Sequence, residues 1–587
     1  MFQPKLTTLL ACMLLCTHSF AQNIVNLEAK HMPFKRALDR ISAQTGYEFT
    51  MADSLRENSP PLDLILHDVS DLEAIRTALG IEGLTYSITG KIVWVYRRGG
   101  APPDTSHPTS PPRVSNLDEA RVIAYGTTTQ RLATSNVSMV AAKDLDIQPV
   151  DNLLLAIEGL VPGFFAKQAS GVPDAGVTVQ IQGQNSIANG NAPLYVINGV
   201  PYSAELSPTT IGTILGSSDV VSGSYGSPLA FINPADIESI TVLKDADATA
   251  IYGSRAANGA ILITTKKGKA GPTRLTLDFQ QGTGGIAHEL PMLNTPQYLG
   301  MRHEALHNDG AVPGPADYDL NGTWDTTRNT DWQKKLIGGT AAYTSAHAAV
   351  SGGNAQTKYL VAGTYRRRTT VFPGNFSDVK GSGYLQLETM SRDKRFTMQL
   401  TASYLVDNNL LPQADLTLFA TMLAPDAPPL LTPGGGLNWE LDSNGMATWE
   451  NPLAYRYMIY HGHTKNMLSN ASFDYRIDSG LYVKLNVGYS DLNTTEVSSN
   501  ALESVAPAIQ WVEGPRARTA LYSTSDISFQ IVEPQISFNR QWGAGKFTAL
   551  AGATAEQGSD NGMIWSGSGY ASDALLTDMR SAAILKR

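Results

Sequence analysis

The chain has 587 residues, of which 52 are glycine and 32 are proline, while 17% are charged. This length predicts several domains, and a composition rich in turn residues and poor in charge favours a largely β protein. The formal net charge of -9, without any basic stripe interleaved with aromatic residues, argues against nucleic-acid binding. Beyond the N-terminus no run of the chain approaches the ~20 apolar residues that a membrane-spanning helix needs, whereas strands can cross a membrane without such a run.

Residues 1–21 have the pattern of a secretory signal peptide. Lys5 precedes an apolar core, and small residues up to Ala21 mark a cleavage site. The two cysteines of the chain, Cys12 and Cys16, both lie in this segment. We therefore expect a mature chain without cysteine, which excludes disulfides, thiolate metal sites and cysteine catalysis.

Residues 22–98 predict a compact α+β domain with an internal repeat. The segment from Ile24 to Met51 has the pattern strand, helix, strand, and the segment from Leu62 to Arg98 has the pattern strand, helix, hairpin. Four apolar residues recur at helical spacing in the first repeat: Phe34, Ala37, Leu38 and Ile41. The arrangement resembles the secretin and TonB N-terminal short domain, which implies periplasmic signalling to an inner-membrane anti-sigma factor. A small α+β adaptor without a signalling partner is the alternative.

A proline-rich linker over residues 99–116 leads to a short β-prone segment within the region 117–130. Such a segment, held on a flexible tether, can add as a strand to the sheet edge of another protein. The sequence LDEARVIAYG resembles the TonB box, which implies binding to the periplasmic C-terminal domain of TonB; the first strand of the next domain is the alternative. The predicted TonB-binding residues are Leu117, Asp118, Glu119, Ala120, Arg121, Val122, Ile123, Ala124 and Tyr125.

The stretch Phe231 to Gly268 is the most informative in the chain. Two β-branched runs, Ile237 to Leu243 and Ala260 to Thr265, flank an alanine-rich segment, which predicts a strand, a short helix capped by Asp245, and a second strand. Its wording, NPADIESITVLKDADATAIYGSRAANG, resembles the plug domain of SusC/RagA-like TonB-dependent outer-membrane transporters. The resemblance implies an α+β plug over residues 131–270.

The run PLYVINGVP also resembles this family, with one departure upstream of the run and one within it. Gln182 stands where arginine is usual, and Asn198 stands where aspartate is usual. Losing both charges together leaves no buried ion unpaired, whereas losing one alone would be costly. Whether these two side chains pair in space is open at the level of sequence.

After Gly271 the sequence alternates between apolar and polar residues, as at Leu275 to Gln280, Phe396 to Tyr404 and Leu481 to Ser490. A lipid-facing β-barrel with a wet lumen needs this pattern, although a soluble β-sandwich shares it. Following a plug-like stretch, the pattern predicts that residues 271–587 form the first part of an antiparallel transmembrane β-barrel. Since barrels of this class have 22 strands, we expect a C-terminally truncated sequence with a partial barrel.

Two short motifs resemble metal sites, and we assign neither a role. His303-Glu304-Ala305-Leu306-His307 matches the HExxH zinc-protease pattern, but such short matches arise by chance. Asp317, Asp319 and Asn321 match the first half of a calcium loop, whose twelfth position would be Arg328 instead of glutamate. The sequence therefore predicts no catalytic residue, cofactor or metal site, and leaves weak calcium binding open.

The prediction as a whole is a multi-domain outer-membrane transporter with an α+β signalling domain in the periplasm, an α+β plug and a partial barrel. The resemblance implies import of an oligosaccharide, glycan or peptide, with TonB, a SusD-like surface lipoprotein, an anti-sigma factor and outer-membrane lipid as partners, and no nucleic acid. The alternatives are a secreted β-rich hydrolase that uses HEALH and a surface receptor that signals without transport.

Overall fold

The structure is a computed structural model in which the chain forms two compact units, Met1–Asn116 and Leu117–Arg587. The described residues are 24–97 without 46, 52–61, 81–83 and 90–91; 120–129 without 124–125; and 136–587 without 146–149, 151, 188–189, 204–205, 208–210, 217–225, 245–248 and 544. The predicted signal peptide, the linker and part of the TonB-binding segment lie outside these residues.

In its described residues, the first unit is a small α+β domain with two sheets and two helices. Its elements are β1 (Ile24–Met32), α2 (Phe34–Thr45), β2 (Glu48–Met51), β3 (Leu62–Ser70), α4 (Asp71–Gly80), β4 (Leu84–Thr89) and β5 (Ile92–Arg97). Strands β1 and β3 pair antiparallel, and the second sheet has the order β2-β5-β4. The predicted apolar face of α2 packs into the core, with Phe34 and Ile41 both buried. The predicted order of strands and helices in both repeats is confirmed.

The second unit begins with a hairpin and an α+β domain that we call the plug. The hairpin consists of β6 (Ala120–Ile123) and β7 (Gly126–Thr129). The plug elements that position the site are β8 (Val137–Ala141), α5 (Ala142–Leu145), α6 (Leu153–Ala156), β9 (Phe164–Gln168), β10 (Val177–Ile181), β11 (Leu194–Ile197), β12 (Val200–Tyr202), β13 (Ile237–Leu243) and β14 (Ala260–Thr265). Five of these strands form a mixed sheet of order β12-β11-β14-β13-β8, in which only β11 and β14 run parallel, while β9 and β10 form a separate pair.

Both strands predicted in the stretch Phe231 to Gly268 are present with the predicted bounds, as β13 and β14. They pair antiparallel with each other. The described part of the segment between them contains a 3₁₀ helix, η4 (Ala250–Ala256), broken at Gly253, where φ is 63°. Asp245, the predicted helix cap, lies outside the described residues. Gly259 enters β14 with φ at 90°, in a space that a Cβ atom could not enter without meeting Ile181 and the Leu243 carbonyl.

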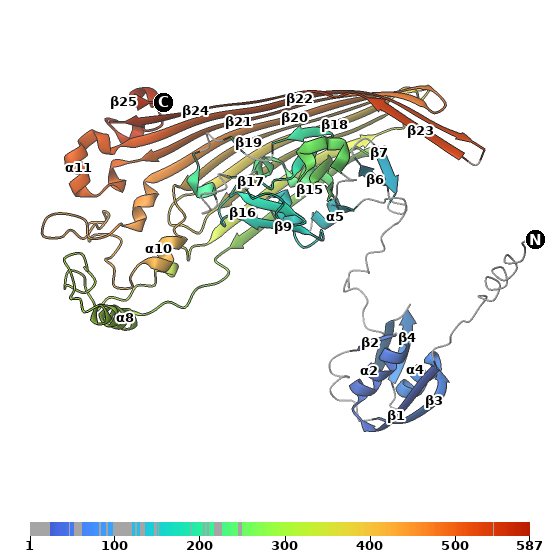
Figure 1. Ribbon diagram of the computed structural model, residues 1–587, viewed down its shortest axis with the longest axis horizontal. Helices are drawn as coiled ribbons and strands as arrows, with labels where there is room; N and C mark the ends of the chain where they lie inside the picture. The colour runs from blue at the N-terminus through green and yellow to red at the C-terminus, as the bar shows by residue number, and fades with distance from the viewer. Residues whose placement is uncertain are drawn as a thin grey trace, which may run out of the picture. The chain divides into compact units, whose positions relative to one another are not determined.

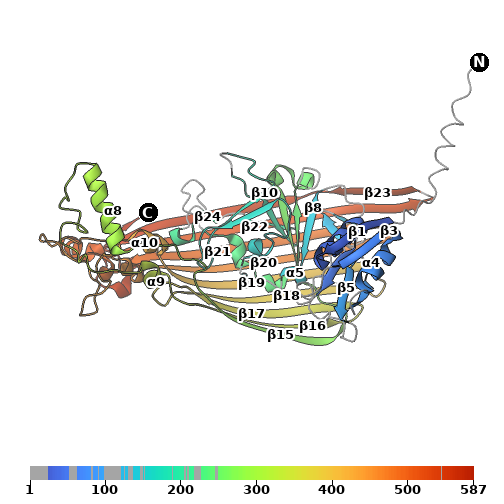
Figure 2. The same ribbon diagram turned by 90° about the horizontal axis from the view of Figure 1, so that it is seen from below.

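Residues after the plug form one sheet of 11 antiparallel strands. The strands are β15 (Gly271–Gly284), β16 (Ala341–Gly353), β17 (Thr357–Thr369), β18 (Ser377–Met390), β19 (Phe396–Pro412), β20 (Met458–Asp478), β21 (Leu481–Asn500), β22 (Thr519–Trp542), β23 (Gly545–Gly552), β24 (Ala555–Ser568) and β25 (Ile584–Lys586). Within the described residues the sheet is open, with β15 at one edge and β25 at the end of the main strand order. The predicted partial barrel thus corresponds to a curved, open sheet (Figures 1 and 2).

The plug lies against one face of this sheet, as both views show (Figures 1 and 2). The loops at one end of the strands carry α8 (Thr295–Asn308), α9 (Trp332–Leu336), α10 (Thr417–Met422) and α11 (Pro507–Glu513). The alternation predicted for β19 has the expected consequence: Leu405 and Asp407 are buried on the plug-facing side, whereas Tyr404 is 47% exposed. No helix in the described part of the chain is both long and apolar enough to span a bilayer.

Candidate functional site at the contact between plug and sheet

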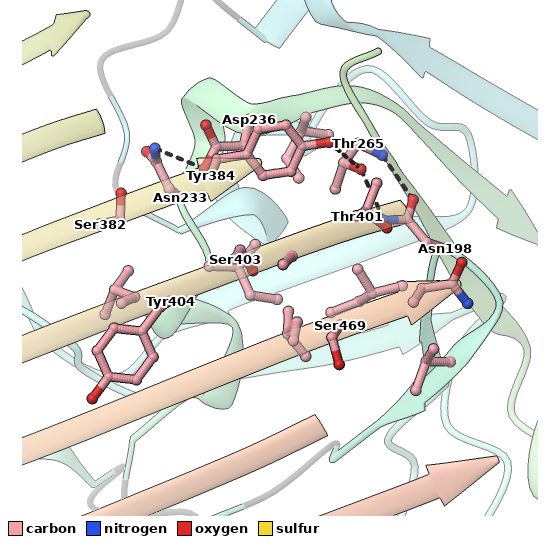
Figure 3. Close-up of a pocket in the computed structure, with 18 of the residues that line it drawn as sticks. Asn198, Asn233, Asp236, Thr265, Ser382, Tyr384, Thr401, Ser403, Tyr404 and Ser469 are labelled. Carbon is pink, nitrogen blue, oxygen red and sulfur yellow. Dashed lines mark hydrogen bonds between the residues drawn. The ribbon is translucent and has the colours of Figure 1, made fainter. Parts of the chain in front are cut away.

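A hydrogen-bonded cluster attaches the plug to the inner face of strand β18 (Figure 3). Asn198 and Thr265 bind each other twice: the Asn198 amide nitrogen donates to Thr265 Oγ1 at 2.8 Å, and the Thr265 backbone N–H donates to Asn198 Oδ1 at 3.0 Å. From β18, the hydroxyl of Tyr384 lies 2.8 Å from Thr265 Oγ1 and donates to the Lys266 carbonyl at 2.6 Å. Asn198 therefore pairs with Thr265, and Gln182, the other departure from the family wording, is exposed.

A carboxylate follows next to this cluster. Asn233 donates from its amide nitrogen to Asp236 Oδ2 at 3.1 Å and to Thr364 Oγ1 of β17 at 2.8 Å. Burial raises the pKa of Asp236 to about 6, although Asn233, Lys266 and Arg366 act in the opposite direction. The cavity between these groups measures about 30 Å³, which is enough for one or two waters and too small for a substrate. This part of the contact holds the plug rather than a ligand.

The chain leaves the plug through a third fixed point. The backbone N–H of Gly268 donates to Oε1 of Gln386, a fully buried side chain of β18, at 2.7 Å. A Cβ atom at Gly268 would lie 2.5 Å from the carbonyl oxygen of Tyr359 on β17, so only glycine fits this close approach. The transition from plug to sheet is thereby anchored on two neighbouring strands.

A buried ionic cluster forms a further attachment, which the sequence did not reveal. Lys380 of β18 binds the Asp174 carboxylate of a plug loop, donates to the Ala230 carbonyl at 3.2 Å, and lies 3.5 Å from Asp378 Oδ2. Asp407 of β19 is 1% exposed and belongs to the same group of carboxylates. Asp174 and Lys380 are 206 positions apart in the chain, so no local pattern connects them. The available signal was the presence of charges at inward-facing positions of strands.

A larger cavity of about 640 Å³ lies between the plug and the first strands of the sheet. Residues 171–172 and 174–175 of the plug line one side, and residues 282–287 and 368–372 line the other. The cavity is lined by glycines, which leave their backbone accessible, and by apolar and polar side chains, among them Arg368. The volume falls in the usual range for small-molecule and peptide sites, which makes this cavity the candidate contact region for a ligand.

The predicted TonB-binding segment includes strand β6, which pairs only with β7 among the described residues. The five-stranded plug sheet ends at β8 and does not include β6. In the first view the hairpin lies at the end of the unit opposite the loops that carry α8, α10 and α11 (Figure 1). The alternative interpretation, in which the segment is the first strand of the plug sheet, therefore does not fit the strand order.

The HEALH motif lies in α8, a 14-residue helix with a capping box formed by Asn294 and Gln297. Its two histidines, His303 and His307, are exposed, as is Glu304. The one group of three or more potential metal-ligating side chains in the described part of the chain lies elsewhere and includes neither histidine. Two histidines alone make an incomplete zinc site.

The half calcium loop is occupied by an arginine. Arg302 of α8 donates from Nη2 to Asp317 Oδ1 at 2.7 Å and from Nε to Asp319 Oδ2 at 2.8 Å. The amide nitrogen of Asn321 donates to two backbone carbonyls, and its oxygen accepts from Thr323. Because a guanidinium already satisfies the carboxylates and carries a positive charge, these side chains do not form a calcium cage.

Comparison with known proteins agrees with this architecture. Residues 129–260 match the model of the TonB-dependent receptor plug domain. The chain is 30% identical over 347 residues to TonB-dependent receptor P26 of Formosa agariphila, which covers 58% of the chain and 31% of the relative. It is 33% identical over 247 residues to TonB-dependent receptor SusC of Bacteroides thetaiotaomicron, which covers 42% of the chain and 22% of the relative. These matches span less than a third of the curated relatives' length.

Among solved structures, the RagAB peptide importer in its open-open state has a chain that superposes with a TM-score of 0.61 at 23% identity, over 80% of this chain and 53% of that one. The shared fold is a plug held on the inner face of a large antiparallel sheet, and residues 129–260 are similar to the plug domain of TonB-dependent receptors. Among receptors of that class, the chain is similar in sequence to P26 and SusC and similar in fold to the RagAB importer.

Proposed function

We propose that the chain belongs to an energised outer-membrane importer rather than an enzyme. A ligand binds on the outer side, in and around the cavity of about 640 Å³ that the plug shares with β15, β16 and β17. TonB then pairs with the segment Leu117–Tyr125 on the periplasmic side and pulls on the chain that leads into β8. The pull displaces part of the plug, and the ligand passes through the space that opens.

The observation that carries this proposal is the placement of a free strand edge next to the plug. Strand β6 has one edge without a strand partner among the described residues, and an added strand would gain main-chain hydrogen bonds there. The connection from β7 enters the plug at β8, an edge strand of the five-stranded sheet. A force applied at β6 would therefore be delivered to an edge strand of the plug sheet, which has a single strand neighbour.

We propose an oligosaccharide, glycan or peptide as the substrate, with a SusD-like surface lipoprotein as partner. Support comes from the names of the related proteins, SusC and the RagAB peptide importer. The first unit consists of two repeats, the second of which ends in a hairpin. We propose that it signals to an inner-membrane anti-sigma factor, as in the secretin and TonB short-domain family. These assignments follow from resemblance and are tested separately from transport.

The test of the importer uses Val122, at the centre of β6. Val122→Pro removes a backbone donor and blocks strand addition, while Val122→Ala keeps the backbone and serves as the matched control. In cells that carry the gene, uptake of fluorescent oligosaccharide and peptide pools should be lost in Val122→Pro and kept in Val122→Ala, with equal amounts of protein in the outer membrane. Ligand binding at the cell surface should survive in both variants. Unchanged uptake by Val122→Pro would sink the importer proposal.

Two further variants separate the alternatives. Replacing His303 and His307 by alanine should leave uptake intact, whereas a hydrolase based on α8 would lose its activity. Deleting residues 22–98 should abolish transcriptional induction and spare uptake. A receptor that only signals would show no uptake in any variant, including the unaltered protein.

A further inference from the structure

The buried ionic cluster between plug and sheet contains more acid than base. One carboxylate oxygen from each of Asp174, Asp378 and Asp407 lies within 4.8 Å of the other two, and all three residues are buried. Asp378 and Asp407 project from the inner faces of neighbouring strands, where Asp378 is opposite Asn409 and Asp407 is opposite Lys380. The cluster therefore joins one loop of the plug to two strands of the sheet.

Lys380 compensates only one of the three carboxylates. Arg366 lies beside Lys380 on the neighbouring strand β17 and interacts electrostatically with it, but Arg366 also faces Asp236 of the plug. Four buried carboxylates, those of Asp174, Asp236, Asp378 and Asp407, thus share two buried cations. The surplus is two negative charges on buried side chains, and such charges are costly unless a cation neutralises them.

Three oxygens of the cluster have no hydrogen-bond partner among the described residues: Oδ1 of Asp378, Oδ1 of Asp407 and Oδ1 of Asn409. Asn409 is the informative member of this set. It is 2% exposed, and its amide nitrogen lies 3.3 Å from Asp174 Oδ2; turning the amide by 180° would place the unpartnered Oδ1 there instead. A carboxylate without a partner can take up a proton, but an amide oxygen cannot, so its need for a donor or a cation persists at any pH.

We propose that Asp174, Asp378, Asp407 and Asn409 bind a calcium ion that joins the plug to the sheet. Four oxygen ligands of this kind, completed by water or a nearby carbonyl such as that of Pro173, suit a hard cation. The three carboxylate oxygens all lie within 4.8 Å of one another, a separation that ligands of one calcium ion can span at bond lengths of about 2.3–2.6 Å. Magnesium is usually held by only one or two carboxylates and keeps several waters, so a site of three carboxylates favours calcium.

The ion's charge of plus two equals the surplus negative charge of the cluster. Its position also gives it a consequence for the plug, because Asp174 belongs to the loop that lines the large cavity. With calcium bound, this loop is tied to β18 and β19; without it, repulsion among the carboxylates favours release of the loop. The inference concerns the chain's own ion binding and does not depend on transport.

Equilibrium dialysis of the detergent-solubilised full chain against radioactive calcium tests the proposal. We expect one calcium site with a dissociation constant of roughly 0.1–1 mM, the range of extracellular calcium modules. Unlabelled calcium should compete for this site, and magnesium should compete more weakly. Asp407→Asn keeps the side-chain shape, and Asp174→Gly removes a carboxylate at a position where φ is already 60°. Each should weaken binding at least about tenfold. Asp317→Asn, which changes the carboxylate held by Arg302, is the matched control and should bind as the unaltered chain does.

Thermal unfolding provides a second measurement in case a variant is poorly folded. Calcium at about 5 mM should raise the unfolding temperature of the unaltered chain and of Asp317→Asn, and chelation should reverse the rise. The proposal is overturned if the unaltered chain binds no calcium at this concentration, since a shared proton would then account for the cluster. It is equally overturned if calcium binding persists unweakened in folded Asp407→Asn and Asp174→Gly, since the ion would then lie elsewhere.

Discussion

Replacing Tyr384 by phenylalanine should loosen the central part of the plug without altering its shape. The side chain is 4% exposed, and its hydroxyl is the group on β18 that binds both Thr265 Oγ1 and the Lys266 carbonyl. Removing one hydroxyl leaves buried polar groups of β14 without this partner, which costs about 1–3 kcal/mol. The ring remains, so there is no cavity to add to this cost. The equilibrium constant for local opening should rise roughly 5- to 150-fold.

Native-state hydrogen exchange of the full chain, read by mass spectrometry on peptides that contain β14, measures this opening directly. Exchange of the β14 amides should accelerate by the same factor, while peptides from α2 in the first unit exchange as before. Tyr404→Phe is the control, because Tyr404 projects from the opposite face of the neighbouring strand and is 47% exposed. Equal exchange in Tyr384→Phe and the unaltered chain, or equal acceleration in Tyr404→Phe, would refute the reasoning.

Gly259→Ala should destabilise the plug by about 1–3 kcal/mol, since the new Cβ would lie 2.8 Å from Ile181 Cδ1 and 2.9 Å from the Leu243 carbonyl oxygen. The control is Gly183→Ala, at a position with a positive φ and open space around the Cβ, and thermal unfolding should show a smaller loss of stability for it. Burial raises the pKa of Asp236 to about 6, above its usual value. Between about pH 4 and pH 6 the folded plug therefore holds a proton that the unfolded chain gives up. The free energy of unfolding falls as the pH rises through this range. Asp236→Asn should therefore gain about 3 kcal/mol at pH 8 and little at pH 4 in urea titrations; equal gains at both would contradict the shift.

The parts of the fold that sequence predicted are those in which local pattern decides structure. The β-branched runs Ile237–Leu243 and Ala260–Thr265 became β13 and β14 with unchanged bounds. Helical spacing likewise placed the buried face of α2 correctly. Of the helix predicted between β13 and β14, the beginning lies outside the described residues; the described part is a 3₁₀ helix that is broken at Gly253, where φ is positive.

The contacts that hold the plug could not be predicted, because each depends on register between distant strands. Tyr384 reaches Thr265 only because β18 presents its even-numbered residues to the plug, and a shift of one residue would turn that side chain outward. The same register brings Lys380 and Asp378 to the inner face. Sequence showed the alternation in these strands but not which plug residue each inward side chain would meet.

The two attachments of the plug differ in what releases them. The Tyr384 cluster consists of neutral hydrogen bonds at the end of β14, which lies in the interior of the plug sheet. Breaking one of these bonds leaves a buried donor or acceptor without a partner, which costs free energy. The ionic cluster at Asp174 is held by charge, and in the calcium proposal above it responds to ions. In the mechanism proposed above, a pull on β6 would act first on β8, whose five residues pair with β13 alone. Loss of this edge strand would leave the hydrogen bonds between Tyr384 and the end of β14 in place, so the plug would open in part before those bonds break.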